Sequence, residues 1–357
     1  MLKLPLPTGP YGSHLERVSR SFAFCIEQLE EPLRRHVGLG YILCRMADTV
    51  EDSAWESLAA QTAAFVSFES FIHAPANEEA VRAWAAGFPS GIPEGEALLL
   101  RDAPRFFADL HSLPRGVQAV LQRTVLSMVR GMKFFCQQDQ GAANPQSLAE
   151  ANQYCFFVAG IVGELLTDLV AEGVPAYRPD ARTYTDAFHF GLYLQKINLL
   201  KDQLEDAKVG RHLVPNRAEM RDSVLLHAER SLRYIQGIPL EARGYRIFCA
   251  WSFFLGLVSL PFIDRSWREQ KAVKISRQQT FLYLSKVLIK VSNNEALENL
   301  YRENLAALRA EASGQETAPL LPVYGDWFTP LYRGKLSPAA LPELGLFQAP
   351  PAELSFE

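Results

Sequence analysis

Asp48-Thr49-Val50-Glu51-Asp52 and Asp202-Gln203-Leu204-Glu205-Asp206 carry the same acidic pattern, D-x-x-E-D, at two distant places in the chain. On an α-helix, residues i, i+3 and i+4 lie on one face, so each copy presents two aspartates with a glutamate beside them. Like charges at this spacing repel one another and lower helix stability. A chain that carries this cost twice is expected to bind a cation there. Carboxylates without His or Cys suit Mg²⁺, which commonly binds one or two carboxylates together with substrate phosphates.

Each copy could instead be a solvated acidic turn, because acidic runs on helix faces are common. Two matching copies, each behind an apolar helical segment, favour a site for Mg²⁺ and a diphosphate. The predicted ligands are Asp48, Asp52, Asp202 and Asp206, with Glu51 and Glu205 as partial or outer ligands.

The composition of the 357-residue chain is that of an ordinary globular protein, with 48% hydrophobic and 21% charged residues. A net charge of −4 argues against a dedicated nucleic-acid binder, which would usually present a strongly basic face. The five cysteines are far apart and form no C-x-x-C pair, so neither a zinc site nor a disulfide framework is indicated. Free thiols in a reducing cytoplasm fit better.

No membrane anchor is expected from the sequence. The N-terminus lacks a basic stretch followed by an apolar one, which argues against a secretion signal. The longest uncharged apolar run, 247–263, is shorter than the ~20 residues that a membrane span needs and is interpreted as a buried helix. We therefore expect a cytoplasmic protein that can touch a membrane from its surface without spanning it.

The apolar period places the chain in the all-α class. Nearly every long segment repeats apolar residues with the helical period, and none alternates with the period of a strand. We predict one all-α domain over 1–312, whose helices surround a central cavity and bring the two acidic motifs face to face. A helix break is predicted at Gly38 and Gly40. Prolines at and beyond position 319 predict an irregular, Pro-rich C-terminal tail over 313–357.

Several common sites are excluded because their motifs are missing from the sequence. Neither G-x-G-x-x-G after a strand nor G-x-x-x-x-G-K-[ST] occurs, which argues against the two common nucleotide-binding loops. Neither H-E-x-x-H nor any Glu-x-x-His occurs, which argues against a zinc protease and a ferritin-like di-iron bundle.

Five blocks of the sequence resemble the squalene/phytoene synthase family, in particular its squalene synthase branch. They are Ser19-Arg20-Ser21-Phe22; Tyr41-x-x-x-Arg45 leading into Asp48-Thr49-Val50-Glu51-Asp52; Tyr154-Cys155-x-x-Val158-Ala159-Gly160-x-Val162-Gly163; Leu194-Gln195-Lys196-x-Asn198-x-x-Lys201 leading into Asp202; and Val273-Lys274-Ile275. The blocks span most of 14–280 in the family's order, and the second and fourth are the most specific. The resemblance does not extend to the tail beyond about residue 312.

The resemblance implies the all-α isoprenoid synthase fold and a prenyltransferase. It implies head-to-head coupling of two farnesyl diphosphates, with Mg²⁺, to presqualene diphosphate, and then reductive rearrangement with NADPH to squalene. The expected partners are therefore two farnesyl diphosphate molecules and no nucleic acid. Peripheral membrane contact for product release and a monomeric or weakly oligomeric state are further expectations.

The resemblance also suggests roles for individual residues. Arg45 supplies a planar guanidinium to phosphate oxygens, Tyr154 assists proton removal, and the Tyr41 ring stabilises carbocations. Two of these residues have a simpler alternative, a surface ion pair for Arg45 and a buried, hydrogen-bonded hydroxyl for Tyr154. The remaining substrate-binding candidates are Ser19, Arg20, Ser21, Phe22, Val158, Gly160, Val162, Gln195 and Asn198, and the NADPH-binding candidates are Arg211, Lys274 and Arg277.

Two departures from the family pattern concern the reductive step. Lys201 stands directly before Asp202, where squalene synthases usually have arginine, so the charge is kept and the guanidinium fork is lost. Ser276-Arg277-Gln278 follows the fifth block, where the family tends to continue Arg-Lys-Gly. Three alternatives therefore stay open: a non-reductive dehydrosqualene or phytoene synthase, a class I terpene cyclase or chain-elongating prenyltransferase, and a non-catalytic all-α binding protein.

Overall fold

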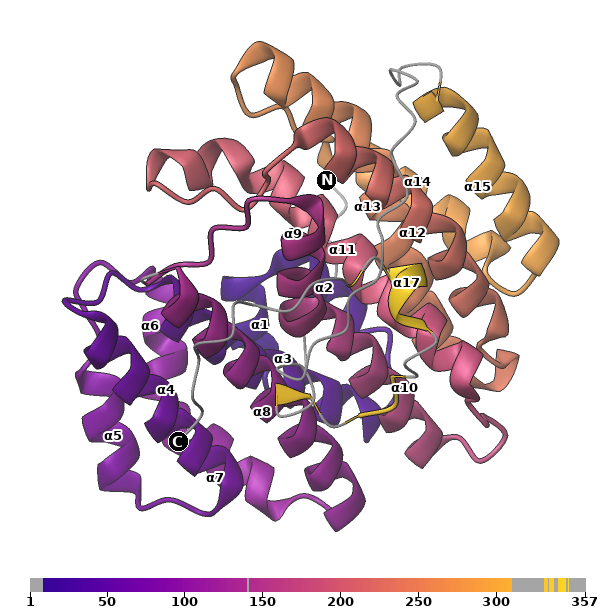
Figure 1. Cartoon of the computed structure of the whole chain (residues 1–357). Helices are drawn as coiled ribbons and strands as arrows, with labels where there is room; N and C mark the ends of the chain where they lie inside the picture. The colour runs from indigo at the N-terminus through magenta and orange to yellow at the C-terminus, as the bar shows by residue number, and fades with distance from the viewer. Residues whose placement is uncertain are drawn as a thin grey trace.

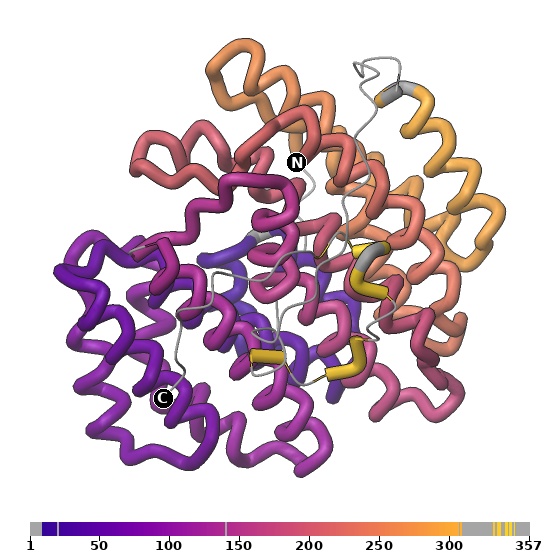
Figure 2. Tube along the Cα trace, in the orientation of Figure 1, coloured from indigo at the N-terminus to yellow at the C-terminus, as the bar shows by residue number. Residues whose placement is uncertain are grey.

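The structure is a computed structural model that describes residues 9–139, 141–309, 331–332, 334–336, 340–344 and 346. Within these residues all regular secondary structure is helical, which confirms the predicted all-α class (Figures 1 and 2). The elements are α1 (Gly12–Val18), α2 (Arg20–Ile26), α3 (Leu33–Asp52), α4 (Leu58–His73), α5 (Glu78–Ala86), α6 (Glu94–Arg101), α7 (Ala103–Ser112), α8 (Arg115–Gln138), α9 (Leu148–Cys155), the π-helical turn η1 (Phe156–Gly160), α10 (Ile161–Gly173), α11 (Ala181–Lys208), α12 (Arg217–Gly237), the 3₁₀ turn η2 (Leu240–Ala242), α13 (Arg243–Glu269), α14 (Arg277–Lys290), α15 (Asn294–Arg309) and α17 (Leu341–Leu344).

The long helix α11 is enclosed by its neighbours. It packs against α10, η1, α12 and α13. Its buried residues run around the helix instead of forming one stripe, as expected for a helix surrounded by others. The helices α4 to α7 lie at one end of the molecule, and α14 and α15 lie at the opposite end (Figure 1). The second acidic motif, in the last turns of α11, is therefore held from several sides.

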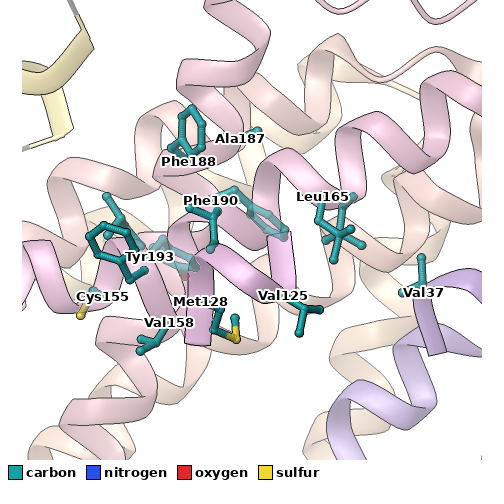
Figure 3. Packing of buried hydrophobic residues seen from close by; sticks show 14 of the residues in the cluster. Val37, Val125, Met128, Cys155, Val158, Leu165, Ala187, Phe188, Phe190 and Tyr193 are labelled. Carbon is teal, nitrogen blue, oxygen red and sulfur yellow. The ribbon is translucent and has the colours of Figure 1, made fainter. Parts of the chain in front are cut away.

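Apolar side chains from four neighbouring segments fill the core beside α11 (Figure 3). Val125 and Met128 come from α8, Val158 from η1, Leu165 from α10 and Phe190 from α11, and all five are buried. They belong to one continuous hydrophobic core that also includes residues of α3. The two helices that carry the acidic motifs are therefore positioned by the same core.

The helix break predicted at Gly38 and Gly40 is wrong, because α3 continues through both glycines. A Cβ atom at Gly38 would lie 3.2 Å from Cδ2 of Tyr11, and one at Gly40 would lie 2.9 Å from Cδ2 of Leu121. These glycines permit close packing against neighbouring side chains. Packing thus outweighs their low helix propensity.

Glycines also allow backbone-to-backbone contact between α11 and the segment formed by η1 and α10. A Cβ atom at Gly163 would overlap the carbonyl oxygen of Ala187, and one at Gly191 would overlap the carbonyl oxygen of Ala159. The glycine in each position is therefore required by the approach of a neighbouring helix. This approach sets the distance between η1, which follows Tyr154, and the helix that carries the second acidic motif.

The described parts of the predicted C-terminal tail pack against the helical body. The hydroxyl of Tyr332 donates to Oε2 of Glu164, and the backbone N–H of Lys335 donates to Oε1 of the same carboxylate at 3.3 Å. The short helix α17 packs on α11, with Leu341 and Leu344 buried. Most of 313–357 lies outside the described residues, so the division into a domain over 1–312 and an irregular tail stays a proposal.

Two helical stretches among the described residues are long and apolar enough to cross a membrane. The first, Leu148–Gly173, has 83% of its most apolar window buried inside the protein, and the second, Leu240–Glu269, has 61% buried. Core helices of globular proteins have the same length and composition. The second stretch contains the apolar run 247–263 and leaves more of its surface uncovered than the first.

The glycine contact between α10 and α11 can be tested by substitution. We expect Gly163→Ala to lower the free energy of unfolding by about 2 kcal/mol or more, because the added methyl group must push α11 away. Gly173→Ala, at the end of the same helix, is the matched control, since a Cβ atom there meets nothing within 4 Å. Urea unfolding of both variants gives the comparison. Equal stability of the two variants would contradict the close approach.

Candidate active site

A cavity of about 480 Å³ lies between α3, η1, α10 and α11, with α2 and α13 at its edge. It contains most of the residues that the sequence singled out. The predicted residues that line it are Ser19, Ser21, Phe22, Tyr41, Arg45, Asp48, Glu51, Asp52, Tyr154, Val158, Val162, Gln195, Asn198, Lys201, Asp202, Asp206 and Arg211. Blocks that are far apart in the sequence therefore meet in one cavity.

Four of the predicted site residues do not line this cavity. Gly160 lies in η1, where a Cβ atom would approach the ring of Phe156. Glu205 is exposed and pairs with Lys208 at 2.7 Å. Lys274 and Arg277 are both exposed and do not belong to the cavity lining. Arg277 is the first residue of α14, and Lys274 lies three residues before it. The side chain of Arg20 lies outside the described residues.

The two acidic motifs meet at one end of the cavity, with Arg211 between them. The guanidinium of Arg211 forms an ion pair with Asp52 at 2.5 Å, and its backbone N–H donates to the carbonyl oxygen of Asp206 at 2.9 Å. Burial and the charges of Asp202 and Asp52 raise the pKa of Asp206, while Arg211 lowers it. The loop after α11 thus brings a cation to both motifs. The family resemblance assigns Arg211 to NADPH binding and does not predict this ion pair with the first motif.

Negative charge in the first motif is only partly compensated. Burial raises the pKa of Asp48 to about 6, and the neighbouring Asp52 adds to this effect while Arg45 and Arg211 oppose it. Burial and the charges of Asp52 and Asp48 also raise the pKa of Glu51 well above its usual range. One oxygen of Glu51, Oε1, is buried without a well-aligned hydrogen-bond partner among the described residues. These carboxylates would gain from a cation placed between them.

The donor set at this end of the cavity fits Mg²⁺ shared with a phosphate group. Among the described residues no cluster of three or more Asp, Glu, His or Cys side chains is close enough to hold a metal by itself. Mg²⁺ does not require one, because it commonly takes one or two carboxylates and completes its shell with water and substrate phosphate. The four aspartates offer hard oxygen atoms on two sides of the cavity, as this arrangement needs.

Arg45 is held in place by a residue that the sequence did not indicate. Its Nε and Nη2 atoms donate to Oε1 of Glu96 on α6, at 3.2 and 2.6 Å, and its Nη1 lies 3.6 Å from Oδ2 of Asp48. Glu96 is 51 residues from Arg45 in the sequence, so no local pattern could have linked them. The pair anchors one side of the guanidinium and leaves Nη1 beside the first acidic motif.

Tyr154 lies at the base of the first motif. Its hydroxyl is within hydrogen-bonding reach of Glu51, and its ring meets the edge of Phe135 with centroids 5.7 Å apart. Burial, followed by the negative charge of Glu51, raises the pKa of Tyr154 well above 10. The phenol is therefore neutral, and it faces the carboxylate whose Oε1 lacks a well-aligned partner.

Tyr41 and Lys201 both line the cavity. The Tyr41 ring lies 5.8 Å from that of Phe22, and burial raises the pKa of Tyr41 to about 12. Lys201 is half-exposed, with Nζ 3.2 Å from Oδ2 of Asp202 and 3.3 Å from Oδ1 of Asn198. Lys201 thus places its charge beside the second motif.

Away from the acidic motifs the cavity wall is apolar. Met128, Leu165, Leu166, Phe190 and Phe248 contribute to it, and Figure 3 shows Met128, Leu165 and Phe190 packed close together. The cavity therefore combines a charged end with an apolar wall. This arrangement suits a ligand with a diphosphate head and a hydrocarbon chain.

Curated relatives of the chain are squalene synthases. The chain is 31% identical over 207 residues to the squalene synthase of Mycosarcoma maydis, a match that covers 57% of the chain and 34% of that protein. It is 28% identical over 279 residues to the squalene synthase of Schizosaccharomyces pombe, covering 71% of the chain and 58% of that protein. It is 30% identical over 211 residues to that of Homo sapiens, covering 58% and 46%. The chain thus matches between a third and three fifths of these relatives' lengths.

Solved structures agree in fold. Two ligand complexes of TcSQS align with TM-scores of 0.71 and 0.69, at 23% and 22% identity. The alignments cover 85% and 93% of this chain and 92% and 96% of those chains. The predicted isoprenoid synthase fold is thereby confirmed. The family model of squalene/phytoene synthase matches residues 15–225, which is more than half of the chain and includes both acidic motifs, so the chain belongs to the squalene/phytoene synthase family.

Proposed function

We propose that the protein is a prenyltransferase that couples two farnesyl diphosphates head to head to presqualene diphosphate, with Mg²⁺. The observation that carries the proposal is the cavity itself, in which two D-x-x-E-D motifs meet at one end of an apolar wall. The named relatives are squalene synthases, which supports the same chemistry. The apolar wall would hold the prenyl chains, and the acidic end would hold the diphosphates.

The carboxylates of Asp48, Asp52, Asp202 and Asp206 are the proposed Mg²⁺ ligands, on the two sides of the cavity. Bound Mg²⁺ neutralises the charge that develops on a diphosphate as its C–O bond breaks. Arg45, oriented by Glu96, directs its Nη1 towards the same place and can donate to a phosphate oxygen. Ser19 and Ser21 offer hydroxyl donors at the rim. Glu51 remains in the proposal as an outer residue that faces Tyr154, whereas the exposed Glu205 is left without a direct role.

Tyr154 is the proposed residue for proton removal as the cyclopropane of presqualene diphosphate forms. Because the phenol is neutral, it needs a partner to accept its own proton. Glu51 lies within hydrogen-bonding reach and is one such acceptor, and an oxygen of the released diphosphate is another. The hydroxyl therefore acts as a relay from the substrate to one of these acceptors.

We also propose that the intermediate is reduced to squalene with NADPH, on the strength of the Asp-Thr-Val-Glu-Asp and Val-Lys-Ile motifs and the squalene synthase relatives. The residues assigned to NADPH by resemblance are not gathered in one place: Arg211 pairs with Asp52 inside the cavity, whereas Lys274 and Arg277 are exposed outside it. This separation favours a non-reductive dehydrosqualene synthase as the second candidate.

The product profile distinguishes these two functions. Purified protein is incubated with farnesyl diphosphate and Mg²⁺, with and without NADPH, and the hydrocarbons are identified by mass spectrometry. We expect presqualene diphosphate without NADPH and squalene with it. Dehydrosqualene under both conditions would assign the protein to the non-reductive branch. Release of no pyrophosphate at all would favour the non-catalytic alternative.

The Asp48→Asn variant tests two separate effects of the carboxylate, its effect on the stability of the fold and its effect on turnover. The folded-state pKa of Asp48, about 6, is above its ordinary value, so the group stabilises the fold below about pH 4 and this contribution is lost as the pH rises through 6. Asparagine mimics the neutral form. In EDTA the variant should therefore be more stable than the parent by about 1 kcal/mol near pH 8, after allowance for partial exposure, with little difference near pH 4.

Thermal unfolding at several pH values measures this difference, with Glu16→Gln at an exposed position of α1 as the control. The same Asp48→Asn variant should lose turnover of farnesyl diphosphate by at least about a hundredfold, because a Mg²⁺ ligand is removed. A stability difference that does not change with pH would refute the charge argument. Unchanged turnover would remove Asp48 from the ligand set.

Tyr154→Phe tests proton removal. We expect formation of presqualene diphosphate to fall by about 10² or more, with little change in the stability of the protein or in the affinity for farnesyl diphosphate. Single-turnover kinetics and substrate titration measure the two quantities. Normal presqualene diphosphate formation would leave Tyr154 as an ordinary buried residue.

A further inference from the structure

We propose that the outer face of α14 docks the protein on an anionic lipid bilayer. The face consists of Phe281, Leu282, Leu288 and Ile289, two adjacent pairs that lie two turns apart on the helix. Ile289 is 84% exposed and Leu282 is 60% exposed, and both belong to the few large apolar side chains that the described surface leaves open. Contiguous exposed apolar residues mark an interaction surface more often than isolated ones do.

The other sides of α14 are already occupied. Leu284 and Val287 are buried on the side that packs against α13. On the side of α15, Lys286 pairs with Glu303 at 3.0 Å, and Asn304 donates to the hydroxyl of Tyr283 at 2.5 Å. The apolar face therefore points away from both neighbouring helices.

Positive charge is concentrated in the segment of the chain that contains this face. Residues 264–290 contain seven Lys or Arg and two Asp or Glu, in a chain whose net charge is −4. Both acidic residues are neutralised, Asp264 by Arg217 and Arg221 and Glu269 by Arg265. In contrast, Arg268, Lys271 and Lys290 have no carboxylate oxygen within 4.0 Å among the described residues.

An apolar face with unpaired cations at its border is complementary to a membrane with negatively charged headgroups. A second copy of this chain is a poorer occupant. In a two-fold symmetric contact the same basic border would meet itself, and the like charges would repel. The membrane is therefore the partner that both the apolar and the charged parts of the surface fit.

The helix that carries this face packs, on its opposite side, against α13, which contributes to the wall of the cavity. Trp251 of α13 donates from Nε1 to the carbonyl oxygen of Leu284 at 3.1 Å, and its ring stacks on Phe24 of α2 at 4.8 Å. The same two helices contribute Phe248 and Phe22 to the cavity lining. This part of the inference rests on the proposed function: a hydrocarbon product without a charged group would pass from the cavity to the bilayer over a short apolar distance.

Vesicle co-sedimentation of the full chain tests the docking surface without any turnover. Vesicles of phosphatidylcholine alone are compared with vesicles that also contain phosphatidylglycerol. We expect binding to the anionic vesicles, weaker binding to the neutral ones, and weaker binding to both at high salt. The double variant Leu282→Gln/Ile289→Gln should bind at least about tenfold more weakly. Arg268→Gln/Lys271→Gln should lose at least about tenfold on anionic vesicles alone.

The matched control is Leu226→Gln/Leu240→Gln, which removes two apolar side chains of similar exposure, 64% and 55%, from other helices. It should bind like the parent. Equal vesicle binding by the parent and the Leu282→Gln/Ile289→Gln variant would overturn the proposal. So would a parent dimer that this variant dissociates, which would assign the face to a second copy. A lower melting temperature of this variant, with unchanged vesicle binding, would show that the apolar face packs against another part of the same chain.

Turnover of farnesyl diphosphate in detergent solution is measured alongside, and it keeps the two proposals separate. The Leu282→Gln/Ile289→Gln variant should keep the parent's turnover while losing vesicle binding. A parent that binds vesicles without turnover would retain the docking surface and lose the proposed reaction. A parent that turns over substrate but binds no vesicle would retain the proposed reaction and lose the docking surface.

Discussion

Negative charge in a partly buried cluster is the constraint on which the rest of this site depends. Asp48 and Glu51 have raised pKa values because α3 buries them beside Asp52. Arg211 and Arg45 offset part of this charge from the two sides. The protein therefore compensates part of the charge of its acidic cluster with its own cations. In the proposed function, a Mg²⁺–diphosphate group would replace part of that compensation.

The framework keeps this charged end apart from an apolar one. The glycines at 163 and 191 let η1 and α10 approach α11 at the level of the backbone, so no side chain separates these segments at the two positions. Glu164 accepts from Tyr332 and from the backbone of Lys335, which ties a C-terminal segment to α10. The π-helical turn η1 lies between these contacts and the cavity, a position in which such turns are often functional.

The two ends of the cavity would divide the work of a prenyltransferase. In the proposed function the aspartates and Arg45 would act on the diphosphate, while Met128, Leu165 and Phe190 would exclude water from the hydrocarbon chain. Exclusion of water strengthens each charge interaction at the other end, because the local dielectric is low. The exposed apolar face of α14 belongs to a helix that packs next to helices lining the cavity. In the proposed docking, this face would bring the protein to a bilayer that can take up a water-insoluble product.

The sequence by itself determined the all-α class, because the helical period of apolar residues persists along the chain. The helical spacing of D-x-x-E-D also placed the aspartates of each motif on one face, whereas the other predicted cavity residues came from the resemblance to the family. The sequence did not determine which member of a motif faces inwards. Glu51 is buried beside Tyr154 and Glu205 is exposed beside Lys208, although both hold the same place in D-x-x-E-D. The phase of each helix relative to the cavity is set by packing against other helices, as are the pairing of Arg45 with Glu96 and that of Arg211 with Asp52. These contacts join residues far apart in the chain, so only the tertiary structure decided them.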